Sequence, residues 1–291
     1  MRIRATVAAV SGALALSALA VPAAQAADAA PSFRAEAAKV LAGHTGSTAF
    51  RTADADAAAD LGVTFSNLKI ASAVKVGTTN HVTTTVTYTL THGANYDVTS
   101  DDFDSGPVIY KGSIDSPEVL LGGEAPASCT VTSTTTAKCT GKIDIYPAAG
   151  DLINSDAGKW SAGAIALQYS SDDFSLQGGL GSTLVQRYSK LTVNASPEPV
   201  KKGKTVTVTG KLSRANWEDN EYHGYATQSV KLQFRKKSSS TYTTLKTIKT
   251  SSTGTLKTTT TATVDGYFRY SFAGTSTTPA VSAAGDYVDV Q

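Results

Sequence analysis

At 291 residues the chain has room for an export segment and about two domains of ordinary size. Its hydrophobic fraction of 41% is enough to build cores, which excludes wholesale disorder, and only 17% of its residues are charged. The formal net charge of +2 conceals an asymmetry, because residues 27–190 hold 17 acidic and 11 basic side chains whereas residues 191–291 hold 7 and 13. Oppositely charged halves can dock on one another, or the basic half can face an anionic polymer.

The first 26 residues have the pattern of a secretory signal peptide. Arg2 and Arg4 form a positive start, residues 7–21 are apolar, and residues 24–26 form a small-x-small cleavage site. The apolar run is too short for a membrane span, and no second candidate span follows it. We therefore expect a secreted protein that is extracellular or associated with the cell wall.

Residues 27–60 form an Ala-rich arm. Phe33, Ala37 and Val40 fall at helical spacing, which predicts a short helix near residues 33–42. Because small apolar faces bury little surface, we expect this arm to be loosely held.

Residues 61–190 are expected to form an acidic β-sandwich domain. Val82, Val86, Tyr88 and Leu90 alternate with polar residues, which is typical of a half-buried strand. Several short strands separated by Gly, Pro, Asn and Asp favour a sandwich. Further strands are expected around residues 108–110, 118–121, 128–131, 142–145, 164–169 and 184–188.

The only two cysteines, Cys129 and Cys139, bracket a Thr-rich alternating stretch. In an oxidising compartment they should form a disulfide across a hairpin. A metal thiolate pair is the disfavoured alternative, because no CxxC motif or histidine lies nearby.

Residues 191–291 are expected to form a basic Ig-like β-sandwich domain. An alternating strand is stopped by Pro197 and Pro199, and a basic glycine turn follows at residues 201–204. Seven strands in about a hundred residues is the immunoglobulin-like number. They are expected at residues 191–195, 205–212, 229–236, 242–248, 255–263, 267–273 and 285–290.

Residues 191–197, 201–212, 230–235, 266–275 and 286–290 resemble the C-terminal Ig-like module of actinobacterial secreted proteins. The N-terminal half is similar to the companion domain of the same proteins, in which a cysteine pair like the one above recurs. The resemblance covers nearly all of the mature chain. It implies a secreted two-domain β-sandwich protein of a poorly characterised group, some members of which carry a calcium-binding label.

The strongest acidic cluster lies within residues 96–106, and a second acidic pair follows much later in the chain. Carboxylates of this density could surround a hard cation with oxygen ligands, and calcium is the only cofactor that the residues suggest. An EF-hand is excluded, because Ser113 stands where the glutamate of that loop would be. The alternative is a solvated acidic loop. The candidate calcium ligands are Asp97, Asp101, Asp102, Asp104, Asp172 and Asp173.

A loop over residues 216–225 combines aromatic side chains with carboxylates and amides. An exposed ring can stack on a sugar while the polar groups bind its hydroxyls. The favoured alternative is that Trp217 covers the end of its own core and that Tyr225 enters the next strand. The candidate ligand-binding residues are Trp217, Glu218, Asp219, Glu221, Tyr222 and Tyr225.

Two basic turns could meet anionic polymers of the cell wall. Lysines at strand ends also serve solubility and block edge pairing, which is the competing interpretation. No nucleic-acid motif or basic-aromatic platform is evident, so nucleic acid is not an expected partner. The candidate basic patch comprises Lys201, Lys202, Lys204, Arg235, Lys236 and Lys237.

No catalytic residues are predicted. The four histidines are far apart and none has a metal-ligand spacing, and no GxSxG or SxxK motif occurs. The sequence therefore favours a secreted, non-enzymatic binding or structural protein of the cell envelope or extracellular matrix, with an unknown ligand. The alternatives are a calcium-binding extracellular protein that uses residues 97–104 and a carbohydrate-binding or hydrolase-associated protein.

Overall fold

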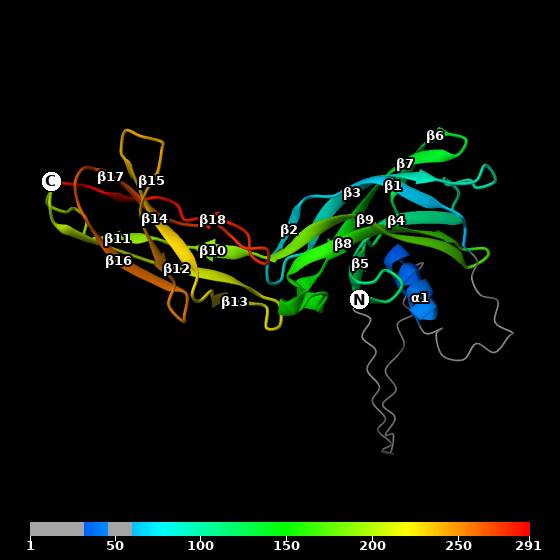
Figure 1. The fold of residues 1–291 in the computed structure, drawn as a ribbon, viewed down its shortest axis with the longest axis horizontal. Coiled ribbons are helices and arrows are strands. Elements are labelled where there is room, and N and C mark those ends of the chain that lie inside the picture. Colours follow the sequence, from blue (N-terminus) through cyan, green and yellow to red (C-terminus); the bar gives the residue numbers. More distant parts are fainter. Residues whose placement is uncertain (1–31, 46–59) are drawn as a thin grey trace, which may run out of the picture. The chain divides into compact units, whose positions relative to one another are not determined.

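The computed structural model describes residues 32–45 and 60–291, so the predicted signal peptide and much of the Ala-rich arm lie outside the described residues. The described part is almost entirely β-structure, with one α-helix, α1 (Phe33–Thr45), and two short 3-10 helices (Figure 1). The expected all-β fold is confirmed. Within residues 32–45 and 60–291, no helix has both the length and the apolar character that a membrane crossing requires.

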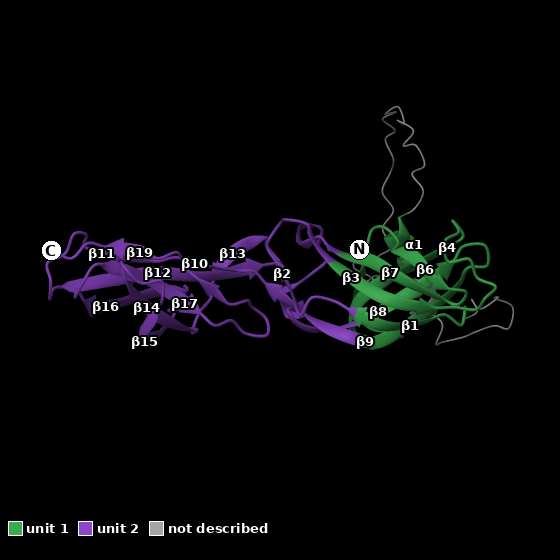
Figure 2. Ribbon diagram, turned by 90° about the horizontal axis from the view of Figure 1, so that it is seen from above, with its two compact units in different colours: residues 1–68, 85–143, 163–180 green, residues 69–84, 144–162, 181–291 purple. Residues whose placement is uncertain are grey.

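The chain divides into two compact units (Figure 2). The first comprises residues 1–68, 85–143 and 163–180, and the second comprises residues 69–84, 144–162 and 181–291. The second unit therefore includes segments that precede residue 190. Separate domains over residues 61–190 and 191–291 stay a prediction.

Nine strands before residue 188 form two sheets. The order in one sheet is β1-β3-β7-β6, and the order in the other is β2-β9-β8-β4-β5, in which β2 pairs with β9 in parallel. In chain order the strands are β1 (Thr64–Lys69), β2 (Ala73–Val76), β3 (Val82–Thr91), β4 (Phe103–Gly112), β5 (Pro117–Gly122), β6 (Ser128–Ser133), β7 (Thr136–Ile145), β8 (Gly158–Gln168) and β9 (Asp173–Arg187).

Strand β3 shows the expected alternation. Val86, Tyr88 and Leu90 are buried, whereas Thr85 and Thr87 between and before them are exposed. Buried residues of β8 and β4 join Tyr88 and Leu90 in one hydrophobic cluster. Period-two patterning therefore specifies which face of β3 meets the core.

Helix α1 packs on the face of β8 that is turned away from this cluster. Phe33 and Ala37 are 5% and 6% exposed, and both cluster with Ile165 and Leu167 of β8. Gly106 of β4 makes room for the Phe33 ring, because a Cβ atom at residue 106 would overlap it. The expectation of a loosely held arm is therefore wrong for this helix, because one aromatic side chain anchors it.

The hairpin of β6 and β7 carries the predicted disulfide between Cys129 and Cys139. The two residues are directly opposite in the register of the strand pair. The expectation of a cross-hairpin bond is confirmed.

Ten further strands form a second sandwich. Its two sheets are centred on the long strand β12 and on the pair β14 and β17. The strands are β10 (Ser189–Leu191), β11 (Asn194–Ser196), β12 (Thr205–Asn216), β13 (Glu221–Gly224), β14 (Ser229–Lys236), β15 (Thr243–Lys249), β16 (Thr255–Thr261), β17 (Gly266–Phe272), β18 (Val281–Ser282) and β19 (Asp286–Val288). The segment expected at residues 191–195 is divided into β10 and β11, and β13 and β18 are additional to the expected strands.

The second sandwich has an apolar and aromatic core, as expected. Val230 and Leu232 of β14 and the alternate residues Phe268, Tyr270 and Phe272 of β17 are buried in one cluster. The Tyr270 hydroxyl donates a 2.8 Å hydrogen bond to a backbone carbonyl of β12 across the sandwich. Burial raises the pKa of Tyr270 to about 12. The phenol therefore keeps its proton at neutral pH.

Candidate functional site

In the acidic loop before β4, the carboxylates of Asp97 and Asp102 accept hydrogen bonds from nearby side chains and backbone groups. Asp97 accepts bonds from the backbone N–H and the hydroxyl of Thr99, at 2.9 and 2.6 Å. Asp102 accepts bonds from the hydroxyl of Ser170 at 2.6 Å and the amide of Gln168 at 3.2 Å. The hydrogen bonds from the Thr99 and Ser170 side chains lower the pKa values of Asp97 and Asp102. Both carboxylates already have donors.

The remaining predicted calcium ligands do not complete a cation site. Asp104 accepts a 2.6 Å hydrogen bond from the hydroxyl of Tyr169, and Asp101 and Asp172 lie exposed in turns. Asp173 is the first residue of β9. Within residues 32–45 and 60–291, no group of three or more His, Cys, Asp or Glu side chains is arranged to hold a metal ion. Calcium binding stays a prediction that this geometry does not support.

Trp217 is not available as a stacking surface for a sugar. It is 2% exposed, and its indole N–H donates a 2.9 Å hydrogen bond to the carbonyl of Gly77. Its backbone N–H donates to the side-chain oxygen of Asn154 at 3.1 Å. The interpretation that Trp217 covers the end of its own core also needs correction, because these hydrogen-bond partners lie outside the core of the second sandwich. The fixed position of Trp217 depends on segments far away in the sequence.

The two tyrosines of the same loop carry cations on their rings. The Lys190 ammonium lies 3.6 Å from the ring centroid of Tyr222, and the Arg214 guanidinium lies 3.9 Å from that of Tyr225. Tyr225 also packs edge-on against Phe272 of the core. Each ring therefore has a cation on one face, and the ring of Tyr225 also packs on the core.

The predicted carboxylates of this loop are exposed. Asp219 bonds locally to Asn216 at 3.0 Å and forms a 2.6 Å pair with His223. Glu218 and Glu221 are exposed beside it. Trp217, the ring expected to stack on a sugar beside them, is buried, so the predicted carbohydrate site does not form around it.

Two buried polar residues at the end of β9 also donate hydrogen bonds to segments that are distant in the sequence. Arg187 is 8% exposed and donates from Nε to the carbonyl of Ala215, while Gln186 donates to the carbonyl of Thr275 at 2.8 Å. Burial lowers the pKa of Arg187 to about 10, so its guanidinium stays charged at neutral pH. We call Trp217, Arg187 and Gln186, with these hydrogen-bond partners, the joint. No sequence pattern predicts the joint, because its hydrogen-bonded residues are distant from one another in the sequence.

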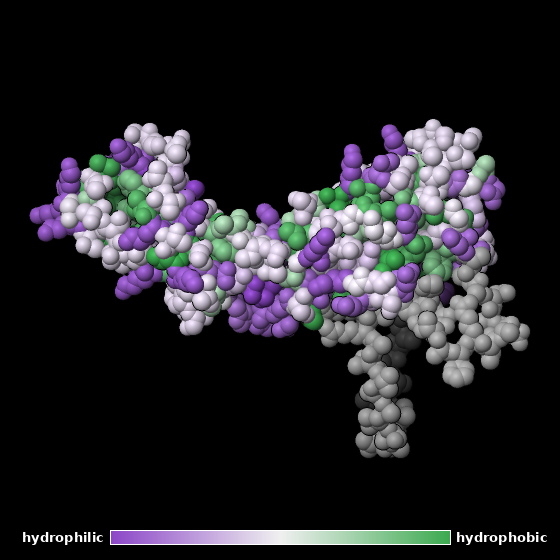
Figure 3. Space-filling model, viewed as in Figure 1, coloured by the Kyte–Doolittle hydropathy of each residue, from purple (hydrophilic) through white to green (hydrophobic). Residues whose placement is uncertain are grey.

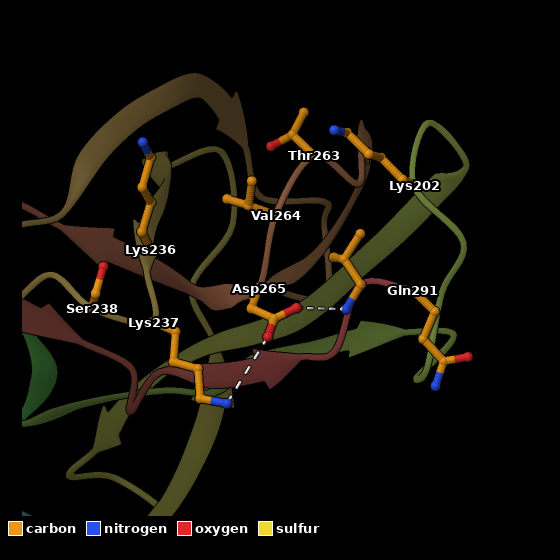
Figure 4. Close-up of a pocket in the computed structure, with 9 residues that line it drawn as sticks. Lys202, Lys236, Lys237, Ser238, Thr263, Val264, Asp265 and Gln291 are labelled. Atoms are coloured by element: carbon orange, nitrogen blue, oxygen red, sulfur yellow. Dashed lines mark hydrogen bonds and ion pairs between the residues drawn. The ribbon is translucent and has the colours of Figure 1, made fainter.

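The two basic turns meet at one pocket of the second sandwich (Figure 4). The pocket has a volume of about 540 Å3 and is formed by the turn before β12, the end of β14, the turn before β17 and the segment after β19. We call it the lysine pocket. Its lining residues are Lys202, Lys236, Lys237, Ser238, Thr263, Val264, Asp265, Val290 and Gln291.

The lining of the pocket contains three lysines and one carboxylate, that of Asp265. Asp265 accepts hydrogen bonds from the backbone N–H of Val290 at 2.9 Å and the hydroxyl of Tyr287 at 3.1 Å. The bond from Val290 is the main reason that the pKa of Asp265 is lowered. Lys237 lies 3.9 Å from Asp265. A hydrogen bond to Tyr287 raises the pKa of Lys237, and Asp265 adds to the effect. Figure 4 shows Lys237 and Asp265 pointing toward one another.

The other two lysines are free to meet a ligand. Lys202 and Lys236 are exposed, and no ion pair joins either of them to a carboxylate within the described residues. Val264, which is 41% exposed, contributes apolar surface between them in Figure 4. The space-filling view likewise shows hydrophobic surface among hydrophilic side chains on this sandwich (Figure 3). The lysine pocket thus combines unneutralised positive charge with an apolar wall.

The predicted basic patch is only partly gathered here. Lys201 and Lys204 are exposed on the same turn as Lys202 but do not line the pocket. Arg235 lies elsewhere, with its guanidinium 3.8 Å from the ring centroid of Tyr267. Neighbouring residues of a strand point to opposite faces, so Arg235 does not line the pocket beside Lys236.

Comparison with known proteins adds no family. No family model matches the chain, and no curated protein matches it. Among solved structures, a marsupial T cell receptor is 12% identical over 78% of this chain and 73% of its own, with a TM-score of 0.35. The fibronectin(III)-like modules of Clostridium thermocellum CbhA are 12% identical over 77% and 92%, with a TM-score of 0.27. The Yersinia pseudotuberculosis adhesin InvE is 13% identical over 76% and 58%, with a TM-score of 0.25. Scores this low support no statement about function.

Proposed function

We propose that the chain is a secreted, non-enzymatic binding protein of the cell envelope or extracellular matrix, and that its second sandwich binds an anionic polymer. One observation carries the proposal. Lys202 and the pair Lys236 and Lys237 come from distant parts of the sequence and line one cavity. The signal-peptide pattern and the resemblance to actinobacterial secreted proteins support the location.

The chemistry of the lysine pocket suits repeated anionic groups. Lysine is a flexible point charge, so it pairs with phosphate or carboxylate without requiring a fixed orientation. A volume of about 540 Å3 lies within the usual range for small-molecule sites. One repeat unit of a polymer would therefore fit. The acidic excess of residues 27–190 would repel the same polymer, which confines binding to the basic sandwich.

The two alternatives have less support. A carbohydrate site at residues 216–225 lacks the indole ring expected to stack on the sugar, because Trp217 is buried. A calcium site at residues 97–104 lacks a set of converging carboxylates within the described residues. No specific observation favours either one.

The proposal is tested with the mature chain and a soluble polyanion. Binding of polyphosphate and of polygalacturonate is measured by calorimetry for the wild type and for a Lys202→Ala, Lys236→Ala, Lys237→Ala variant. We expect the affinity for both polymers to fall about tenfold or more, because three charges at one site are lost. Affinity should also weaken with rising salt concentration.

The matched control removes the same charge elsewhere on the second sandwich. Lys211, Lys249 and Lys257 are exposed and line no part of the pocket, so their replacement by alanine should change affinity little. Equal losses in both variants would show diffuse charge attraction instead of a site. Absence of binding by the wild type to either polymer would refute the proposal.

A further inference from the structure

A second surface lies beside the lysine pocket, on the outer side of the sheet that contains β14, β17 and β19. Along β17, Phe268 and Tyr270 point into the core, whereas Tyr267 and Arg269 are on the opposite face. The strand register places Arg235 of β14 next to Tyr267 on one side and Tyr287 of β19 next to it on the other. We call Tyr242, Arg235, Tyr267, Arg269 and Tyr287 the Tyr–Arg face.

Rings and guanidinium groups alternate on this face. Arg235 lies 3.8 Å from the ring centroid of Tyr267, and Arg269 lies 3.8 Å from that of Tyr242. The rings of Tyr267 and Tyr287 are 5.1 Å apart. All five side chains are half-buried, so part of each remains in solvent. This is the basic-aromatic platform that was not evident in the sequence.

Both arginines keep donors for a ligand. Arg235 donates to the carbonyl of Ser239 at 2.9 Å, and Arg269 donates to the side chain of Gln233 at 2.8 Å. A guanidinium has five N–H donors in a planar fork. Within the described residues, no ion pair joins Arg235 or Arg269 to a carboxylate. The two arginines therefore carry positive charge that no ion pair within the described residues neutralises.

The Tyr–Arg face is continuous with the lysine pocket. The hydroxyl of Tyr287 donates to Asp265 of the pocket at 3.1 Å, and the Lys237 ammonium lies 5.3 Å from the Tyr287 ring centroid. Tyr287 and Lys237 thus form the border between the two. A ligand long enough to leave the pocket at Lys237 meets the aromatic rings next.

We infer that the Tyr–Arg face extends the proposed binding site and that the ligand is an acidic polysaccharide. This inference rests on the proposed function. The flat, apolar faces of pyranose rings pack on aromatic rings, and the acidic groups of the same polymer accept paired hydrogen bonds from arginine. A polyanion without sugar rings, such as polyphosphate, has nothing to place on the tyrosines. The combination of rings and spare cations is complementary to a polymer that has both features.

The test compares polygalacturonate, which has both sugar rings and charge, with polyphosphate, which has charge alone. In the mature chain, Tyr242→Ala with Tyr267→Ala should weaken polygalacturonate binding about tenfold through loss of ring contact, and should leave polyphosphate binding within about twofold. Tyr242→Phe with Tyr267→Phe keeps the rings and should retain most of the affinity. Circular dichroism melts establish that each variant is folded.

A second variant covers the case in which the alanine variant does not fold. Tyr242→Leu with Tyr267→Leu keeps apolar volume but removes the flat rings, and it should weaken polygalacturonate binding severalfold while leaving polyphosphate binding nearly unchanged. Equal loss for both polymers, or no loss for either in a folded variant, overturns the inference. In the second case the lysine pocket and the proposed function stand. Tighter binding of single-stranded nucleic acid than of polygalacturonate also overturns the polysaccharide assignment.

Discussion

The joint and the lysine pocket both contain cationic side chains, but only those of the pocket are accessible to a ligand. At the joint, Arg187 is 8% exposed and donates to a backbone carbonyl. At the pocket, Lys202 and Lys236 are exposed and have no carboxylate partner in the described part of the chain. The residue type alone does not distinguish structure from binding. Burial and the number of donors already used do.

The pKa values of the two regions shift in opposite directions. Burial lowers the pKa of Arg187, because a charged group in a poorly hydrated setting is destabilised. Tyr287 and Asp265 raise the pKa of Lys237 on the surface. Both cations remain charged at neutral pH. The first charge is held by internal acceptors, while the second keeps contact with solvent and is accessible to an anion.

The largest expected effect is a loss of stability when Trp217 is removed from the joint. Trp217→Ala should destabilise the protein by about 3–5 kcal/mol, because it empties the space of a large buried side chain. Trp217→Phe keeps most of the volume and loses the bond to Gly77, at a cost of about 1 kcal/mol. Urea unfolding followed by circular dichroism measures both. A loss below about 1 kcal/mol for the alanine variant would show that the joint adds little to stability.

A matched pair of arginine variants sharpens the comparison directly. Arg187→Ala should cost about 1–3 kcal/mol in free energy of unfolding, because it leaves the buried carbonyl of Ala215 without its donor. Arg269→Ala, on the outer face of β17, should change stability by about 0.5 kcal/mol or less. Thermal and urea unfolding test the pair. Equal costs would mean that the outer arginine is structural as well.

Local patterns predicted much of the fold and little of the joint. Alternation along β3 and the cysteine spacing specify a strand face and a hairpin bond, because both depend on neighbours in sequence. The burial of Trp217 depends on residues 76–77 and 154, and the docking of Phe33 depends on the missing side chain of Gly106. No pattern along the chain announces such pairings.

The basic site lies between these cases. The lysines were identifiable as two turns, but their convergence on one pocket follows from the path of the sheets. The outward position of Tyr267 and Arg269 follows from alternation with the core residues of β17. Their pairing with Arg235 needs the register between strands. Sequence therefore supplies the side chains of a surface, and topology supplies their neighbours.

The smallest expected effect concerns the carboxylates of the acidic loop, which, like the cation of the joint, already have internal hydrogen-bond partners. Asp97 and Asp102 already accept hydrogen bonds from Thr99 and Ser170, just as Arg187 of the joint already donates to a carbonyl, so we expect no calcium-dependent stabilisation. Melting temperatures of the mature chain in EDTA, in millimolar calcium and in millimolar magnesium should agree. A ligand that binds only the native state would raise stability in proportion to the logarithm of its concentration. A calcium-specific rise that disappears when Asp97, Asp101, Asp102 and Asp104 are changed to Asn would restore the calcium hypothesis. It would also show that a ligand can bind carboxylates that already accept internal hydrogen bonds.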